Sequence, residues 1–343
     1  MNVEAFVLST GMVCAIGNGA PQCSASFRAD LSGYILSPVL GRAREPLRIA
    51  LVPEPDLEPL AQTLYTEALA DRERRMLRLA GMALRQIEGF NGPLFLALPE
   101  TRTALGGFRV HPEFVQLLGL QTGARFDPRM SKTFELGRAG GFFALKAALA
   151  ALAAGATQVL VGGVETFLDL RLLAALDAER RLLADDVRDG FTPGEAAAFL
   201  SLTRKHPRRA TTVIRAVGTA HDPGHRYSDE PAHGVGLAAA LDDAQWRSAR
   251  LPAVRTCFAG LNGESFGAKA WGVAHVRHHA LFDPALAFEH PADVYGDVGA
   301  ATATVLLALA DETLRNDQRP GPALVWAASD HAPCGAAYLA AAE

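Results

Sequence analysis

Short runs of apolar residues alternate along the chain with longer, helix-length segments. The short runs have the length of strands and lie at residues 5–8, 94–98, 158–163, 198–202, 213–217 and 324–327. The helix-length segments lie at residues 71–87, 140–154, 236–244 and 299–314. Strands that alternate with helices are typical of an α/β architecture, in which helices cover the faces of a sheet. The sequence therefore predicts an α/β fold.

Glycine, proline and polar residues between these elements predict where helices end and how the chain is divided. Gly155 follows the segment at 140–154 and is expected to cap that helix, because glycine enters positive φ without the steric cost of a Cβ. Polar, proline-bearing joints lie at 204–209 and 222–231, near the middle of the chain. We place a boundary near residue 206, which predicts two halves at residues 1–205 and 206–343.

Composition narrows the class of protein. The 343 residues are 49% hydrophobic and 20% charged, with a formal net charge of -4, which is typical of a globular chain. Nucleic acid and anionic membranes bind clustered cations, and the sequence has no long basic run, so neither partner is predicted. The longest apolar stretch, residues 139–156, is alanine-rich, contains Lys146 and is shorter than the roughly 20 apolar residues that span a bilayer. No membrane span is predicted.

Cysteine usage and the N-terminus favour a cytoplasmic location. The four cysteines, at positions 14, 23, 257 and 334, are scattered and form no CxxC pair, so reduced thiols are expected rather than a disulfide scaffold. The first residues include Glu4 and lack the cationic start and long apolar stretch of a signal peptide.

A glycine-rich turn at residues 135–144 leads into the predicted central helix. Such a turn could cradle an anion at a helix N-terminus, or it could let two backbones approach closely. Neither GxGxxG nor GxxxxGK[ST] is present, which favours packing, and no cofactor is predicted.

Five segments resemble, in chain order, motifs of the β-ketoacyl synthases of the thiolase-like superfamily. They read STGMVCAIGN at 9–18, FRADLSG at 27–33, GATQVLVGGVE at 155–165, DGFTPGEAAA at 189–198 and YGDVGAA at 295–301. The fourth is the most specific, because it resembles the family motif DGFxxGEGAA. The resemblance implies a duplicated thiolase-like fold of α-β-α-β-α layers, and a dimer formed across the half that carries the nucleophile.

The resemblance also implies where the family's catalytic residues would lie. The condensation uses a cysteine thiolate, two histidines and a lysine. At the family's spacing the cysteine position falls on Gly137, the histidine positions on Gly260 and Asp297, and the lysine position on Ala292. An aspartate, with an unperturbed pKa of about 3.9, could not serve as a neutral imidazole donor near pH 7. We therefore expect no condensation, because a fold carries no function without its site.

Other chemistry remains open at the expected mouth of the site. Cys334 and His331 could form a relocated thiolate and base, with Glu264 or Asp297 as further candidates, in an acyltransferase-type reaction. Three residues on a loop do not fix hydrogen-bond geometry, so a structural cysteine is favoured. The histidines at 275, 278 and 279 are interpreted as a solvated helix face, and no metal site is predicted.

Several residues are candidates for binding a substrate or a carrier. Arg138 and Asn262 lie near the expected site mouth. Arg74, Arg75 and Arg78, in the segment at 71–87, are the best candidates for docking an acidic acyl carrier protein, with a solvated helix face as the alternative.

Three hypotheses follow. The leading one is a catalytically incompetent β-ketoacyl synthase-like subunit that acts as a partner or scaffold, similar in logic to a chain length factor. It would form a homodimer, or a heterodimer with an active synthase, in fatty-acid or polyketide biosynthesis, and it could shape an acyl pocket. The alternatives are an acyl-thioester transferase or hydrolase with altered site residues, and a protein-binding adaptor without acyl chemistry. An apolar tunnel at Gly137 would favour acyl binding, whereas a filled site would leave surface interaction.

Overall fold

The computed structural model describes residues 4–87, 89–101, 108–207, 211–244 and 251–342. Its main feature is an eleven-stranded mixed sheet. The strands of this sheet are β1 (Ala5–Cys14), β2 (Gly17–Asn18), β6 (Leu94–Ala97), β8 (Lys132–Phe134), β9 (Val159–Thr166), β10 (Glu195–Thr203), β11 (Thr212–His221), β12 (Val254–Ala259), β13 (Phe282–Glu289), β14 (Ala323–Ala328) and β15 (Pro333–Ala341). Their order is β13-β12-β14-β15-β11-β1-β10-β9-β6-β8, with β2 beside β1.

The same arrangement of five strands occurs twice in this sheet. In chain order β1, β6, β8, β9 and β10 form one set, and β11 to β15 form the other. Each set has its strands in the spatial order third, second, fourth, fifth, first, with parallel pairs at the outer end and antiparallel pairs at the inner end. The sets meet where Ala5 of β1 pairs with Ile214 of β11.

This repetition confirms the predicted α/β fold. The predicted division at residue 206 falls in the connection between β10 and β11, and the division itself stays a prediction.

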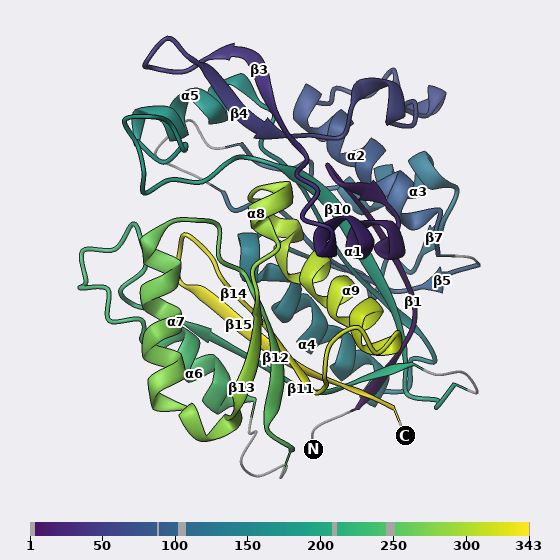
Figure 1. Cartoon of the computed structure of the whole chain (residues 1–343). Coiled ribbons are helices and arrows are strands. Elements are labelled where there is room, and N and C mark those ends of the chain that lie inside the picture. The colour runs from purple at the N-terminus through teal and green to yellow at the C-terminus, as the bar shows by residue number, and fades with distance from the viewer. Residues whose placement is uncertain (1–3, 88, 102–107, 208–210, 245–250, 343) are drawn as a thin grey trace.

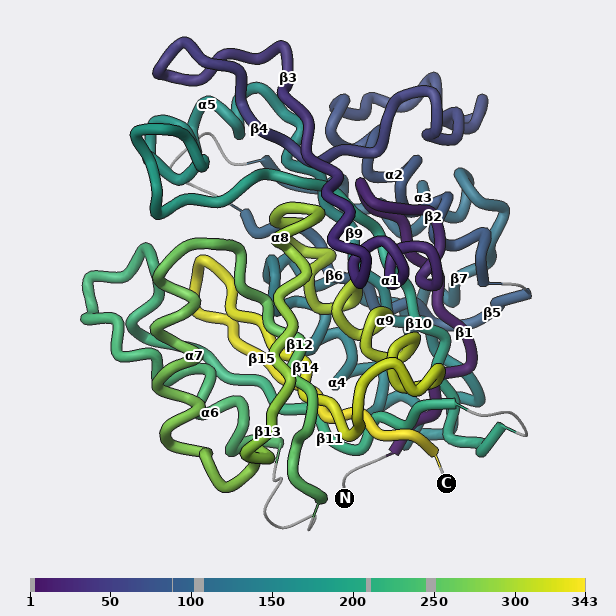
Figure 2. The backbone as a smooth tube through the Cα atoms, viewed as in Figure 1, coloured from purple at the N-terminus to yellow at the C-terminus, as the bar shows by residue number. Residues whose placement is uncertain are grey.

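Two helices lie between the two sets of strands. α4 (Gly140–Ala153) and α9 (Thr302–Arg315) pack against each other and against strands of both sets (Figures 1 and 2). Both are largely buried, as expected for helices that are apolar on most sides. Their close approach depends on Gly141, because a Cβ there would lie 2.7 Å from the Cβ of Ala303.

The remaining helices cover the outer faces or the ends of the sheet. α2 (Asp71–Leu84) packs on β1, β9 and β10 and contacts α3 (Phe114–Thr122), and α6 (Val235–Asp243) packs on β11 and β15 beside α7 (Ser265–Arg277). The other elements are α1 (Ala20–Arg28), α5 (Leu170–Ala178), α8 (Ala292–Tyr295), the hairpin of β3 (Tyr34–Leu40) and β4 (Pro46–Ala50), and the short pair β5 (Asn91–Gly92) and β7 (Arg125–Phe126). In the part of the chain that is described, no helix is both long and apolar enough to cross a bilayer.

The apolar pattern located the buried elements well. Each of the six predicted strands and four predicted helices overlaps an observed one, and Gly155 ends α4 with φ +111°. The pattern missed β15, because its sequence PCGAAYLAA has none of the β-branched residues that mark a strand. It also missed the exposed hairpin and the edge strands, where burial does not impose an apolar run.

The start of α7 depends on one carboxylate. Ser265 donates its backbone N–H and its hydroxyl to Asp189, at 2.6 and 2.7 Å, and the backbone hydrogen bond is the main cause that lowers the pKa of Asp189 below 3.8. We expect Asp189→Ala to destabilise the fold by about 1 kcal/mol at pH 7.

The pH dependence of this effect has a definite sign. Because the folded-state pKa of Asp189 is the lower one, its contribution is present above the unfolded pKa and is lost as the pH falls through the folded value. Urea midpoints of wild type and variant should therefore converge below about pH 4. Curves that stay equally separated at pH 7 and pH 3.5 would contradict this assignment.

Candidate functional site

A glycine turn stands where the family's nucleophile is predicted. Gly137 opens a 3₁₀ turn (Gly137–Ala139) directly before α4 and has φ +62°, a conformation that favours glycine. A Cβ at this position would lie 2.6 Å from Cγ and 2.8 Å from Cδ of Glu100. The volume that a side chain at residue 137 would need is therefore filled by Glu100.

An equivalent glycine turn occurs in the second half of the fold. Gly299 opens the 3₁₀ turn (Gly299–Ala301) before α9 with φ +47°, and a Cβ there would lie 2.5 Å from Cγ of Glu165. Glu165 is buried, accepts a hydrogen bond from Arg72 at 2.6 Å and accepts another from the Ala300 N–H at 3.4 Å. Burial raises the pKa of Glu165, although its pairing with Arg72 opposes the shift.

The other three predicted catalytic positions lie around one small space. Gly260, Ala292 and Asp297 line a common space together with the two predicted binding residues, Arg138 and Asn262. The volume of that space is about 10 Å³. A water molecule needs at least about 10–15 Å³ by the same kind of measure, so a substrate has no room there.

Arg138 and Asp297 fill this space with a buried ion pair. The Arg138 Nε donates to Asp297 Oδ2 at 2.8 Å, and Nη2 donates to the same carboxylate. Arg138 Nη1 also donates to Asp330 at 2.8 Å. Asn262 donates its Nδ2–H to Asp297 at 2.8 Å. Asp297, at one of the predicted histidine positions, is thus a buried acceptor for a guanidinium and an amide.

The ion pair continues into a larger network. Arg181 donates two hydrogen bonds to Glu264, at 2.8 and 2.7 Å, and two to Asp330, both at 2.8 Å. Arg226 lies 3.1 Å from Glu264 and 3.5 Å from Asp330. Three arginines and three carboxylates therefore neutralise one another, with Asp330 contacting all three arginines.

The protonation of the arginines follows from this pairing. Burial by itself lowers the pKa of Arg138 and of Arg181, but the carboxylates beside them, Asp297 and Asp330 for the first and Glu264 and Asp330 for the second, outweigh it and raise both values. Burial and the neighbouring Arg181 lower the pKa of Arg226. The guanidinium groups are permanently charged near neutral pH, so the three arginines of this network do not exchange protons.

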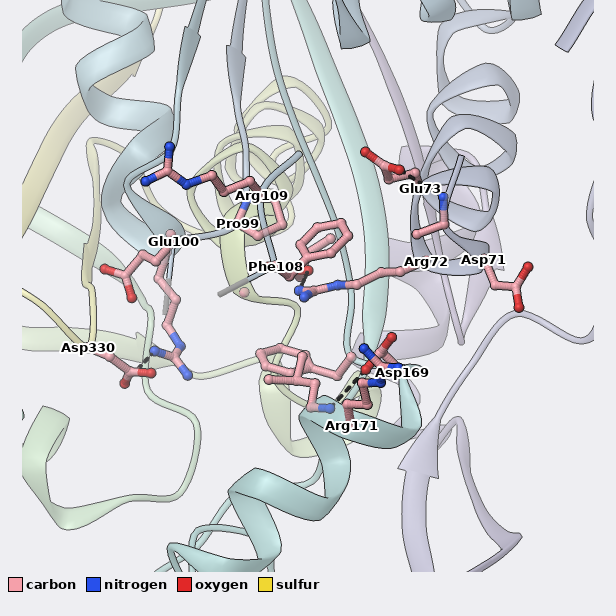
Figure 3. Close-up of a pocket in the computed structure, with 17 residues that line it drawn as sticks. Asp71, Arg72, Glu73, Pro99, Glu100, Phe108, Arg109, Asp169, Arg171 and Asp330 are labelled. Atoms are coloured by element: carbon pink, nitrogen blue, oxygen red, sulfur yellow. Dashed lines mark hydrogen bonds and ion pairs between the residues drawn. The ribbon is translucent and has the colours of Figure 1, made fainter. Parts of the chain in front are cut away.

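A cavity of about 590 Å³ lies on the other side of Gly137. Gly137 and Gly299 both reach its wall, and Figure 3 shows the charged residues that surround it. Its charged lining consists of Asp71, Arg72, Glu73, Glu100, Arg109, Arg138, Glu165, Asp169, Arg171 and Asp330. A pocket for an acyl chain is lined mainly by apolar side chains. This cavity is therefore not the apolar tunnel that would favour acyl binding.

Cys334 does not have the surroundings of a nucleophile. It lies at the start of β15, is 3% exposed and donates its Sγ–H to the Ala332 carbonyl at 3.7 Å. Burial raises the pKa of its thiol to about 12, so the thiolate is scarce near neutral pH. His331 pairs instead with Glu100, with Nδ1 and Oε2 3.4 Å apart. The proposed role of the two residues as thiolate and base stays a prediction, and this geometry does not favour it.

The arginines predicted to dock a carrier are held within the chain. Arg75 donates to Glu195 through Nε and Nη2, both at 2.6 Å, and Arg78 donates to Glu54 at 2.6 Å. Burial lowers the pKa of Arg75, but Glu195 outweighs it and raises the value. Arg74 donates to the Leu69 carbonyl at 3.2 Å. Such contacts occupy much of the hydrogen-bonding capacity of Arg75 and Arg78, whereas Arg74 makes this one contact, and carrier docking stays a prediction.

Sequence reasoning missed Glu100, Arg181 and Arg226 as parts of the site. None of the three lies within one of the motifs, and no local pattern marks them. One signal was available: a charged residue, Asp297, at a position where the family is expected to have a histidine implies a buried charge that needs partners. Among the described residues, no cluster of His, Cys, Asp and Glu could hold a metal ion.

No model of a known protein family matches the sequence, and no curated protein matches it either. Solved structures do. A ketosynthase in complex with its chain length factor from Xenorhabdus doucetiae has a TM-score of 0.77 and 14% identity, with 99% of this chain and 98% of that chain covered. A β-ketoacyl synthase from Burkholderia phymatum has a TM-score of 0.74 and 16% identity over the whole of both chains.

A third similar structure is a type II polyketide acyl carrier protein in complex with its ketosynthase, AntDE:AntF, with a TM-score of 0.71 and 18% identity over the whole of both chains. With the duplicated strand order, these matches define the class of fold. The chain has the thiolase-like fold of the ketosynthases, as its motifs predicted.

Proposed function

We propose that this chain is a non-condensing ketosynthase-like subunit that acts by pairing with an active ketosynthase in a fatty-acid or polyketide-type complex. The observation that carries the proposal is the neutral ionic network of Arg138, Arg181, Arg226, Glu264, Asp297 and Asp330. It occupies the space in which a condensing enzyme needs a thiol and two imidazoles.

The chemistry of these groups argues against catalysis. A nucleophile must be a thiolate or another activated group, and a general base must titrate near the working pH. Gly137 supplies no side chain, and the arginines around Asp297 and Glu264 keep those carboxylates in ion pairs. What the fold retains is a shape that a related subunit can recognise.

A sheet edge offers a surface for such pairing. β8 ends the path of the sheet on the side of Gly137, and Lys132 and Thr133 in it are exposed. An edge strand presents unpaired N–H and C=O groups that a strand of another chain can bind. The similarity in fold to a ketosynthase and chain length factor complex supports a heterodimer, and the similarity to a carrier-bound ketosynthase supports an acyl carrier protein as a further partner.

The first test is for covalent chemistry. We expect intact mass spectrometry to find no adduct after incubation of the protein with malonyl and medium-chain acyl thioesters, because no accessible thiolate is available. An active ketosynthase run in parallel gives the positive control. An acyl adduct that is lost in Cys334→Ala and kept in Cys257→Ala would overturn the proposal and support the enzyme alternative.

The second test separates a synthase partner from the adaptor alternative. A tagged chain expressed with the ketosynthase encoded nearest to it should co-purify with that enzyme in a defined ratio. Substitution of Thr133 by proline, which removes a backbone donor from the edge strand, should weaken the complex at least tenfold. Stable recovery of an unrelated protein, with no binding to a ketosynthase, would favour the adaptor.

A further inference from the structure

Two of the four cysteines lie in contact with each other. Cys14 is the last residue of β1, Cys23 lies in α1, and their Sγ atoms are 3.6 Å apart. We propose that Cys14 and Cys23 form a reversible disulfide when the protein meets hydrogen peroxide, which makes this pair a redox-sensitive site. The inference concerns the chain itself and does not depend on the partner subunit.

The geometry of the pair favours bond formation. A disulfide S–S bond is about 2.0 Å long, so the two sulfur atoms need to approach by about 1.6 Å, a displacement of the size that side-chain rotation produces. A Cβ at Gly17 would lie 3.1 Å from Cys23 Sγ, so the glycine in the turn after Cys14 leaves room for this thiol. Cys257 and Cys334 are free thiols as well, but within the described ranges neither makes such a contact with another cysteine.

The two thiols differ in their access to a reagent. Cys14 lines a cavity of about 610 Å³, and the residues in the wall of that cavity belong to the described part of the chain. Its exposed fraction of 3% admits a small oxidant rather than a bulky acyl thioester, whereas Cys23 is fully buried. A hydrogen bond with Cys14 and burial raise the pKa of Cys23, so that thiol stays protonated near neutral pH. Cys14 is therefore the thiol that the peroxide meets first.

The oxidation consumes one peroxide for each pair of thiols. The Cys14 thiolate attacks one oxygen of hydrogen peroxide, so that an S–O bond forms and the O–O bond breaks. The leaving hydroxide takes up the proton that the Cys14 thiol lost, which gives water and a sulfenic acid. The Cys23 sulfur then attacks the Cys14 sulfur, an S–S bond forms, and the S–O bond breaks. The second hydroxide leaves as water with the Cys23 proton, and the two electrons that the thiols lose have reduced the peroxide.

The disulfide ties α1 to the end of β1. Residues 15–22 lie between the two cysteines, and a cross-link that closes such a loop removes conformations from the unfolded chain. α1 also packs against α9, and the Ser24 hydroxyl donates to Gln318 at 3.0 Å. Oxidation therefore fixes a helix that contacts the buried α9, and the oxidised protein should melt at a higher temperature than the reduced one.

Peroxide treatment of the full chain, followed by mass spectrometry, tests the proposal. After treatment and alkylation under denaturing conditions, two of the four cysteines should escape alkylation, and a peptide map should contain Cys14 joined to Cys23. Dithiothreitol should restore all four thiols. The melting temperature should rise by several degrees on oxidation and return on reduction. Cys257→Ala, a matched control at another buried cysteine, should form the same bond.

Two further variants separate the roles of the thiols. Cys23→Ala should leave Cys14 as a sulfenic acid that dimedone labels, whereas Cys14→Ala should keep Cys23 as an unmodified thiol. Circular dichroism checks that each variant folds, and the wild-type peptide map decides the proposal even where a variant does not. Alkylation of all four cysteines after peroxide, a disulfide that contains Cys257 or Cys334 instead, or dimedone labelling of the wild type without a cross-link would overturn the proposal.

Discussion

Replacing Asp330 by alanine is expected to destabilise the protein by about 3–5 kcal/mol, because it leaves buried arginines without their shared counter-ion. Asp330 is 5% exposed and contacts Arg138, Arg181 and Arg226. Its removal changes a neutral group of three cations and three anions into one with a net positive charge. Desolvated charge without a partner is among the most destabilising changes a core can undergo.

Urea unfolding followed by circular dichroism measures this effect. The matched control is Lys146→Ala, which breaks an ion pair with Asp243 whose side chains are 47% and 39% exposed. We expect the control to change the free energy of unfolding by less than about 1 kcal/mol. If Asp330→Ala is no more destabilising than Lys146→Ala, then water screens the network and it does not fill the site as described.

Introducing a cysteine at Gly137 is expected to lower the free energy of unfolding by about 2–5 kcal/mol. A side chain in the left-handed region is strained by roughly 1–2 kcal/mol, and overpacking a filled site adds about 1–3 kcal/mol. The φ of +62° gives the first contribution, and the 2.6 Å approach to Glu100 gives the second. The same variant should form no acyl-enzyme, because Glu100 occupies the volume that an acylated side chain at residue 137 would need.

Two further variants separate the clash with Glu100 from the backbone strain and provide a control. Gly137→Cys combined with Glu100→Ala should recover part of the lost stability, since it removes the clash but keeps the backbone strain. Gly272→Ala, at an exposed helical position where a Cβ meets no atom within 4 Å, should be neutral or stabilising by up to about 1 kcal/mol. Stable acylation of the Gly137→Cys protein by an acyl thioester would show that the site is more open than the contacts of Glu100 indicate.

These two experiments address different parts of one arrangement. The family's catalytic centre needs a cavity at the start of α4, and here Glu100 fills it from one side while the ionic network fills it from the other. Buried ion pairs contribute little net stability compared with apolar packing, but removing one partner is strongly destabilising. The network therefore keeps the site filled, but it adds little to the free energy of unfolding.

The sequence by itself predicted the fold, and its motifs place Gly137, Gly260, Ala292 and Asp297 at the positions expected for the family's catalytic side chains. Apolar runs such as 158–163 and 198–202 became central strands because burial on both faces requires apolar residues along the chain. The motif at 189–198 and the spacing that leads to Gly137 are properties of the sequence itself, so they are found without the tertiary structure.

Only the tertiary structure decided which side chains fill the space around these predicted positions. Arg138, Arg181 and Asp330 are separated by 43 and 149 residues, and their charges meet because the folded chain brings together the segments that carry them. The structure also decided that the arginines of α2 are held by Glu54 and Glu195, whereas Arg109 and Arg171 face an open cavity. Ion pairing depends on distance in space, which spacing along the chain does not encode.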